Sequence, residues 1–111
     1  MGVVVKREGA VVVARLTGAL DHVGARELEA AVGLPGAKGL RLVLELSRAG
    51  PVASSGVAGL IKIHDDLERS GGRLIIAAPA KAVRAVLELT ELLATFRVAD
   101  TVEEAVRLAG G

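Results

Sequence analysis

Two adjacent serines, Ser54 and Ser55, are the side chains best placed for chemistry, because they stand before a glycine near the start of a helix predicted over about 56–69. A helix N-terminus offers unpaired N–H groups and the positive end of the helix dipole, and both favour an anion. A phosphate there would add roughly −1.5 to −2 charges. Gly56, followed by Val57, would let the backbone of a partner approach closely. The alternative is structural: serine is a preferred N-cap, and the motif alone favours a simple helix start.

A second group of candidates lies where a predicted strand turns into a predicted helix, in the segment Leu16-Thr17-Gly18-Ala19-Leu20-Asp21-His22. Asp21 is predicted to cap the helix over about 22–32, and the same carboxylate is equally suited to contact a partner. His22 is expected to be exposed. A role for it in proton transfer would need a neighbouring nucleophile or a pocket, and the sequence indicates neither.

The other polar candidates fit structural roles better than catalytic ones. His64 falls on the apolar stripe of the second predicted helix, where a partly buried structural histidine is expected. Asp65 and Asp66 point about 100° apart on a helix, so a solvated face is favoured over a shared metal ion. The chain has no phosphate-binding loop, no dinucleotide fingerprint and no nucleophile elbow. We therefore expect no enzymatic activity, no metal and no cofactor.

The composition indicates one small domain over residues 1–111 and excludes several functions. Of the 111 residues, 51% are hydrophobic, which is enough for one core. Phe96 is the only aromatic residue and the net charge is +1, so neither base stacking nor a basic patch supports nucleic-acid binding. The absence of cysteine is compatible with a reducing cytosol. The apolar stretch 3–5 is too short for a signal peptide, and no run could cross a bilayer. We expect a cytoplasmic monomer.

Hydrophobic periodicity predicts the elements that must position these residues. Strands are predicted over residues 3–5, 11–16, 40–46, 74–78 and about 96–98, and residues 47–53 are predicted to form a loop. Besides the two helices already mentioned, one helix is predicted to begin near Pro79 and one at Thr101, where Thr101 and Glu104 fit a capping box. The predicted inner faces of the first three helices consist of Ala25, Leu28 and Val32; Val57, Leu60, Ile61 and Leu67; and Val83, Val86, Leu87 and Thr90.

The order of these elements predicts the fold class. The first two strands flank Arg7-Glu8-Gly9-Ala10, a spacing typical of a hairpin. Strands and helices then alternate, which favours right-handed crossovers and a mostly parallel sheet. In residues 40–46 leucines alternate with Arg41, Val43 and Glu45, which predicts full cover on one face of the sheet and less on the other. The predicted fold is one α/β domain with a mixed, mostly parallel sheet of about five strands and about four helices.

The combination of motifs resembles the STAS domains of bacterial anti-sigma factor antagonists over essentially the whole chain. The resemblance rests on the order of elements, the L-T-G-x-L-D turn, the S-S-G at the second helix, and the segments L-E-L-T-E-L-L and T-V-E-E-A near the C-terminus. It implies that Ser55, or alternatively Ser54, accepts a phosphate. It further implies that Asp21, His22 and residues 54–57 contact an anti-sigma factor of the serine-kinase type. Binding would release a sigma factor for transcription, and phosphate on Ser55 would weaken it.

One position departs from the family pattern: Ala53 stands where the family usually has an aspartate directly before the two serines. Two possibilities therefore stay open. Either a cognate kinase phosphorylates Ser55, or the protein binds its partner constitutively or under a different control. Two further alternatives are a STAS-like structural subunit of a larger assembly, such as a stress-signalling complex or a lipid-transport ATPase, and a domain that binds a small regulatory ligand.

Overall fold

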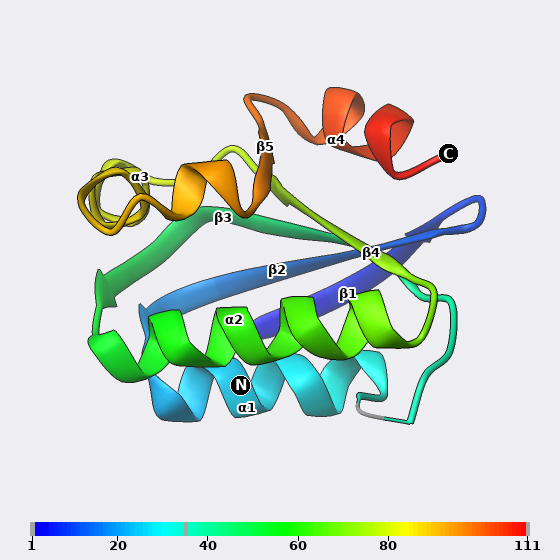
Figure 1. Cartoon of the computed structure of the whole chain (residues 1–111), viewed down its shortest axis with the longest axis horizontal. Helices are drawn as coiled ribbons and strands as arrows, with labels where there is room; N and C mark the ends of the chain where they lie inside the picture. The colour runs from blue at the N-terminus through cyan, green and yellow to red at the C-terminus, as the bar shows by residue number, and fades with distance from the viewer. Residues whose placement is uncertain (1, 35, 111) are drawn as a thin grey trace.

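The computed structural model describes residues 2–34 and 36–110 and shows a twisted sheet with helices on both faces (Figure 1). Within these residues, one sheet contains five strands in the order β1-β2-β3-β4-β5. The strands are β1 Val3–Glu8, β2 Val11–Leu20, β3 Arg41–Val52, β4 Arg73–Ala77 and β5 Arg97–Ala99. The helices are α1 His22–Val32, α2 Ser54–Arg69, α3 Lys81–Leu89, the 3-10 turn η1 Leu92–Ala94, and α4 Val102–Ala109.

The strand pairing confirms the predicted hairpin and the mostly parallel sheet. β1 runs antiparallel to β2, and the turn between them contains Gly9 at a φ of +63°. The pairs β2–β3, β3–β4 and β4–β5 are all parallel. Parallel neighbours end at the same edge of a sheet, so the helices that follow β2 and β3 begin close together. This edge positions the candidate residues.

Two hydrophobic cores lie on opposite faces of the sheet. The larger one packs against α1 and α2, and the leucines Leu42, Leu44 and Leu46 of β3 are fully buried in it. The smaller one lies under α4, which Figure 1 shows on the other face of the sheet. α4 does not extend over β1, whose Val4 is 64% exposed. The predicted unequal cover of the two faces therefore holds for the hairpin side of the sheet, whereas Val43 of β3 is buried under α4.

The predicted loop over 47–53 is wrong, because β3 continues to Val52. Its extension pairs with an equally extended β2, in the pairs Thr17↔Arg48, Gly18↔Ala49 and Leu20↔Val52, with irregularities between them. Sequence periodicity missed this segment because the bulged register interrupts the alternation of buried and exposed side chains.

The second helix also differs from its prediction. α2 begins at Ser54 instead of residue 56. Leu60 and Leu67 are fully buried as expected, but the third fully buried aliphatic residue is Ile63, whereas Val57 and Ile61 are half-buried. The core stripe of the helix is therefore rotated slightly from the predicted one.

The C-terminal helices follow their predictions closely. The Thr101 hydroxyl accepts a hydrogen bond from the Glu104 N–H at 3.1 Å, while the Glu104 carboxylate accepts from the Asp100 N–H, one residue before the predicted partner. The prediction that Thr90 lies on the buried face of this helix is wrong: Thr90 is the C-cap residue after α3, it is exposed, and its hydroxyl donates to the Val86 carbonyl. Among the described residues, no helix has the length and apolar character needed to span a membrane.

Candidate functional site

The site is built where β2 and β3 end together. Leu20, the last residue of β2, pairs with Val52, the last residue of β3. The next residue along, Ala53, donates its N–H to the Leu20 carbonyl at 2.9 Å. After β2 the chain continues into α1 and after β3 into α2, on the same face of the sheet, so the first turns of both helices lie side by side (Figure 1). We call this region, made of Asp21, His22 and residues 53–56, the serine corner.

Gly56 permits the close approach of the two helix starts. A Cβ atom at this position would overlap the carbonyl oxygen of Leu20 and crowd the Asp21 nitrogen. Gly56 is accordingly buried. The backbone that packs against this glycine therefore belongs to the chain itself, rather than to a partner as the sequence suggested.

The two helices are capped differently. Asp21 is the N-cap of α1, and its Oδ1 accepts a hydrogen bond from the Gly24 N–H at 2.9 Å, as predicted. The N-cap of α2 is Ala53, which has no side chain to serve as a cap. The structural explanation of the serines as N-caps is therefore wrong. Ser54 and Ser55 belong to the first turn of α2, where their hydroxyls do not cap their own helix.

The Ser55 hydroxyl makes its contact with the other helix. Its Oγ accepts a hydrogen bond of 3.1 Å from the backbone N–H of His22, the first residue of α1. Ser54 and Ser55 are both exposed, and within residues 2–34 and 36–110 the Ser54 hydroxyl has no hydrogen bond. The structure thus brings Asp21, His22 and both serines together. The two serine hydroxyls differ, because among the described residues only that of Ser55 has a hydrogen-bond partner.

The surface around the corner is mixed in polarity. His22 is exposed as expected, and Val23 beside it is 61% exposed, so an apolar side chain adjoins the polar groups of the corner. Val57 is half-buried at the edge of the surface. The sequence did not single out Val23, although its place directly after the Asp21-His22 turn is a visible signal.

An ion pair between Lys62 and Glu29 links α2 to α1, further along both helices than the serine corner. Lys62 of α2 contacts Glu29 of α1 at 2.7 Å and Asp66 of its own helix at 3.1 Å. The hydrogen bonds from the Lys62 ammonium to Glu29 and then to Asp66 raise the pKa of this lysine. The Asp66 side chain is only 16% exposed and belongs to this ion-pair bridge, whereas Asp65 is exposed. The described residues contain no cluster that could hold a metal ion.

His64 has the structural role that its position predicted. Its ring packs edge-on against Phe96 with ring centroids 5.4 Å apart. The imidazole is half-buried, and its Nδ1 has no hydrogen-bond partner in the described part of the chain. Neither ring lies in the serine corner.

A second polar cluster, which sequence reasoning missed, lies on the α4 face of the sheet. Glu45 of β3 is only 5% exposed and accepts hydrogen bonds from the N–H and hydroxyl of Ser47 and from the Nε of Arg15, the last at 2.7 Å. Burial by itself raises the pKa of the Glu45 carboxyl, but the hydrogen bonds from Ser47 and the charge of Arg15 outweigh it and leave the pKa below 4.5. We call these three residues the Glu45 network. The sequence signal that could have indicated this network was a glutamate among the leucines of a strand in the middle of the sheet.

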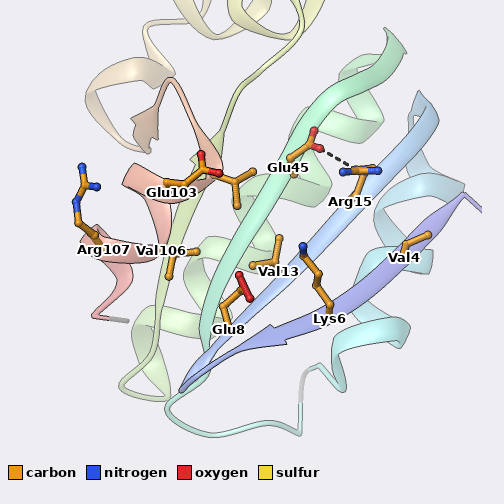
Figure 2. Close-up of a pocket in the computed structure, with 10 residues that line it drawn as sticks. Val4, Lys6, Glu8, Val13, Arg15, Glu45, Glu103, Val106 and Arg107 are labelled. Carbon is orange, nitrogen blue, oxygen red and sulfur yellow. Dashed lines mark hydrogen bonds and ion pairs between the residues drawn. The ribbon is translucent and has the colours of Figure 1, made fainter.

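The Glu45 network borders a groove of about 630 Å³ that opens between α4 and the hairpin (Figure 2). Val13 and Val106 contribute to its apolar part. Charged residues of both signs line it as well, with Lys6 and Glu8 on β1 and Glu103 and Arg107 on α4. No aromatic side chain lines the groove, so it offers no stacking surface for a nucleotide base.

Comparison with known proteins agrees with this geometry. The family model of the STAS domain matches residues 3–105. The chain belongs to the STAS domain family. As a STAS domain it has the expected single α/β unit, with the mixed five-stranded sheet and the N-terminal hairpin described above.

Several relatives of this STAS domain are named as anti-sigma factor antagonists. It is 31% identical over 94 residues to BtrV of Bordetella bronchiseptica, named as an anti-sigma factor antagonist, with 84% of this chain and 81% of BtrV covered. It is 28% identical to an anti-sigma factor antagonist from Mycobacterium paratuberculosis, with a TM-score of 0.82 over 98% of this chain and 93% of the other.

The anti-sigma factor antagonist SpoIIAA is a third relative. In its unphosphorylated form it is 27% identical, with a TM-score of 0.76 over 98% of this chain and 97% of SpoIIAA. The phosphorylated form of SpoIIAA, from Bacillus, superposes with a TM-score of 0.68 over 95% of this chain and 96% of the other. SpoIIAA therefore resembles this chain in both its unphosphorylated and its phosphorylated form.

Proposed function

We propose that this STAS domain is an anti-sigma factor antagonist that binds an anti-sigma factor of the serine-kinase type through the serine corner. The observation that supports this function most is the pairing of the two helix starts, which brings the half-buried Asp21 together with the exposed His22, Ser54 and Ser55. The names of three relatives point to the same class of protein. Binding would compete with the sigma factor for the anti-sigma factor and so free the sigma factor for transcription.

The surface has the composition of a docking site for a protein. Val23 is an exposed apolar side chain directly after Asp21 and His22, and the exposed Ser54 adds a polar group to the same corner. Interfaces of modest size combine an apolar centre with a polar rim in this way. The backbone beneath this surface is rigid, because Gly56 packs directly on the Leu20 carbonyl. We expect little ordering of the chain on binding, which lowers the entropic cost of association.

Phosphorylation of Ser55 would act as the off-switch. Its hydroxyl is exposed in the first turn of α2, so a phosphate can be added without opening the core. The added charge would have to be desolvated in the interface and would repel acidic partner groups, and both effects weaken binding. Because Ala53 supplies no carboxylate, the phosphate would meet no acidic side chain at the position directly before Ser54.

The binding experiment uses the purified domain and the kinase-type anti-sigma factors encoded in the genome of its source. Isothermal titration calorimetry is expected to show one-to-one binding for the native chain and Ser55→Ala, and binding weaker by about tenfold or more for Ser55→Asp. Ala10→Asp is the matched control, because it places the same charge in the hairpin turn at the opposite end of β2. Equal affinity of the Ser55→Asp and Ala10→Asp variants would contradict the switch, and no binding by the native chain would contradict the function.

The groove beside α4 favours a second candidate function, a domain that binds a small regulatory ligand. Its volume of about 630 Å³ lies in the range of small-molecule sites. Thermal-shift screening with nucleotides and amphipathic metabolites is expected to raise the melting temperature of the native chain but not of Val106→Arg, which would fill the groove. A panel that leaves the native melting temperature unchanged would argue against this candidate.

A further inference from the structure

The two serine hydroxyls differ in one contact, which comes from outside their own helix. The N–H of His22 donates to the Ser55 Oγ at 3.1 Å across 33 positions of sequence. Ala53, the residue before the serines, has no polar side chain, and no side-chain hydrogen bond caps α2. Within residues 2–34 and 36–110, the α1 backbone is thus the one group that orients either serine hydroxyl.

The position of this N–H is determined by the fold. Leu20 is held by the sheet register with Val52, and its carbonyl accepts the Ala53 N–H. Asp21 caps α1 through Gly24, which fixes the direction of the first turn. Since Gly56 rests on the Leu20 carbonyl, the first turn of α2 cannot move away from α1 without breaking these contacts. A hydrogen bond between such fixed groups holds the serine rotamer with little additional loss of entropy.

We propose that His22, through its backbone N–H, is the positioning residue that selects Ser55 over Ser54 for phosphorylation. The proposal rests on the proposed function, in which a partner kinase phosphorylates the serine corner. The N–H occupies one lone pair of the Ser55 Oγ and leaves the hydroxyl proton free to be donated to a base of the kinase. It also stabilises the negative charge that develops on the oxygen as the proton leaves.

The phosphoryl transfer itself is a simple substitution. The Ser55 Oγ attacks the γ-phosphorus of ATP bound to the kinase, and the hydroxyl proton passes to a base of the kinase. The bond from the γ-phosphorus to the bridging oxygen breaks, and ADP leaves with the electron pair. A hydroxyl already held in one rotamer reaches the in-line geometry of this step more often than the free hydroxyl of Ser54.

The decisive variant is His22→Pro, because it removes this N–H and nothing else from the backbone. His22 is the first residue of α1, a position where proline is tolerated in helices. The residue before it, Asp21, has the extended backbone that precedes proline, at φ −137° and ψ −169°. His22→Ala is the matched control: it removes the imidazole and keeps the N–H.

The measurement is the rate of phosphorylation of the full chain by its partner kinase with ATP, resolved by site with mass spectrometry. In the native chain and His22→Ala we expect phosphate on Ser55. Loss of the imidazole from the proposed interface affects KM in both variants alike, so His22→Pro is compared with His22→Ala: its kcat for Ser55 should be about three- to tenfold lower at a similar KM, and its share of phosphate on Ser54 higher. Equal kcat for all three chains overturns the proposal, and so does an equal loss in both variants, which would assign the effect to the imidazole.

A second measurement keeps the proposal testable if His22→Pro does not fold. Amide hydrogen exchange of His22 is expected to be slower in the native chain than in Ser55→Ala, by about three- to tenfold, and unchanged in Ser54→Ala. Exchange that is equally fast in the native chain and Ser55→Ala overturns the proposal. If the kinase leaves both serines of the native chain unmodified, the proposed switch fails, which is a result distinct from loss of selectivity.

Discussion

The serine corner and the Glu45 network both connect polar groups on neighbouring strands or helices, yet they do so in opposite ways. At the serine corner the polar side chains are exposed, and a backbone N–H and a capping carboxylate organise them. In the Glu45 network a carboxylate is buried and needs three hydrogen bonds to offset the loss of water. The arrangement of the exposed polar groups therefore depends on how the backbone packs, whereas the buried carboxylate depends on the donors that Arg15 and Ser47 supply.

The largest expected effect comes from breaking the backbone packing of the serine corner. Gly56→Ala places a Cβ on the Leu20 carbonyl, so α2 must shift, and we expect the free energy of unfolding to fall by about 3 kcal/mol. Urea denaturation measures this change. Gly36→Ala is the control, because a Cβ there meets only an ordinary contact with Gly33, and its stability should change little. Similar losses in both variants would refute the packing account.

Removing the charge of the Glu45 network should have the next largest effect on stability. Glu45→Gln leaves Arg15 and Ser47 without their anionic acceptor, and we expect a loss of about 2 kcal/mol, limited because the Arg15 side chain is 44% exposed. Glu103→Gln is the control on the rim of the same groove. Urea midpoints that coincide for the two variants would show that the buried hydrogen bonds contribute nothing.

The same network predicts how stability depends on pH. The pKa of Glu45 is lowered in the folded state, so its stabilisation is complete above the unfolded value near 4.5. It is lost as the pH falls through the lowered pKa, because the folded carboxylate must then take up a proton. The difference in unfolding free energy between the native chain and Glu45→Gln should therefore shrink between about pH 7 and pH 3. Denaturation at a series of pH values tests this, and a constant difference would be contrary evidence.

Substitutions of two helix N-cap residues distinguish an effect on stability from an effect on binding. Asp21→Ala and Thr101→Ala each remove the N-cap of one helix, α1 and α4, and each should lower the unfolding free energy by about 1 kcal/mol. Only Asp21→Ala should also weaken binding to the anti-sigma factor, because α4 does not form part of the serine corner. Calorimetric titration of both variants compares them, and equal weakening would place the interface elsewhere.

The smallest expected effect on stability belongs to Ser55. Ser55→Ala removes one exposed hydrogen bond, and we expect the unfolding free energy to change by less than about 0.5 kcal/mol. Thermal or urea denaturation beside the native chain measures it. A loss as large as that of Glu45→Gln would mean that Ser55 is part of the structural core of the corner, contrary to the contrast drawn above.

Much of the fold could be predicted because it follows from local patterns. The β-branched runs around Gly9, the leucines of 40–46 and the apolar run 74–78 each specify a strand by composition and periodicity. Asp21 and Thr101 could be identified as caps because capping depends on residues within one turn. The extension of β3 to Val52 could not be predicted, since it depends on pairing with a distant, bulged part of β2.

The candidate site divides in the same way. The sequence by itself determined that two serines and a glycine stand near a helix start and that Asp21 caps another, because these are neighbours along the chain. Only the tertiary structure decided that Ala53 is the N-cap, that Gly56 packs on the chain's own Leu20, and that Ser55 alone accepts the His22 N–H among the described serine hydroxyls of the corner. Parallel strands with a common end bring residues 22 and 55 together, and this proximity over 33 positions cannot be read from local sequence.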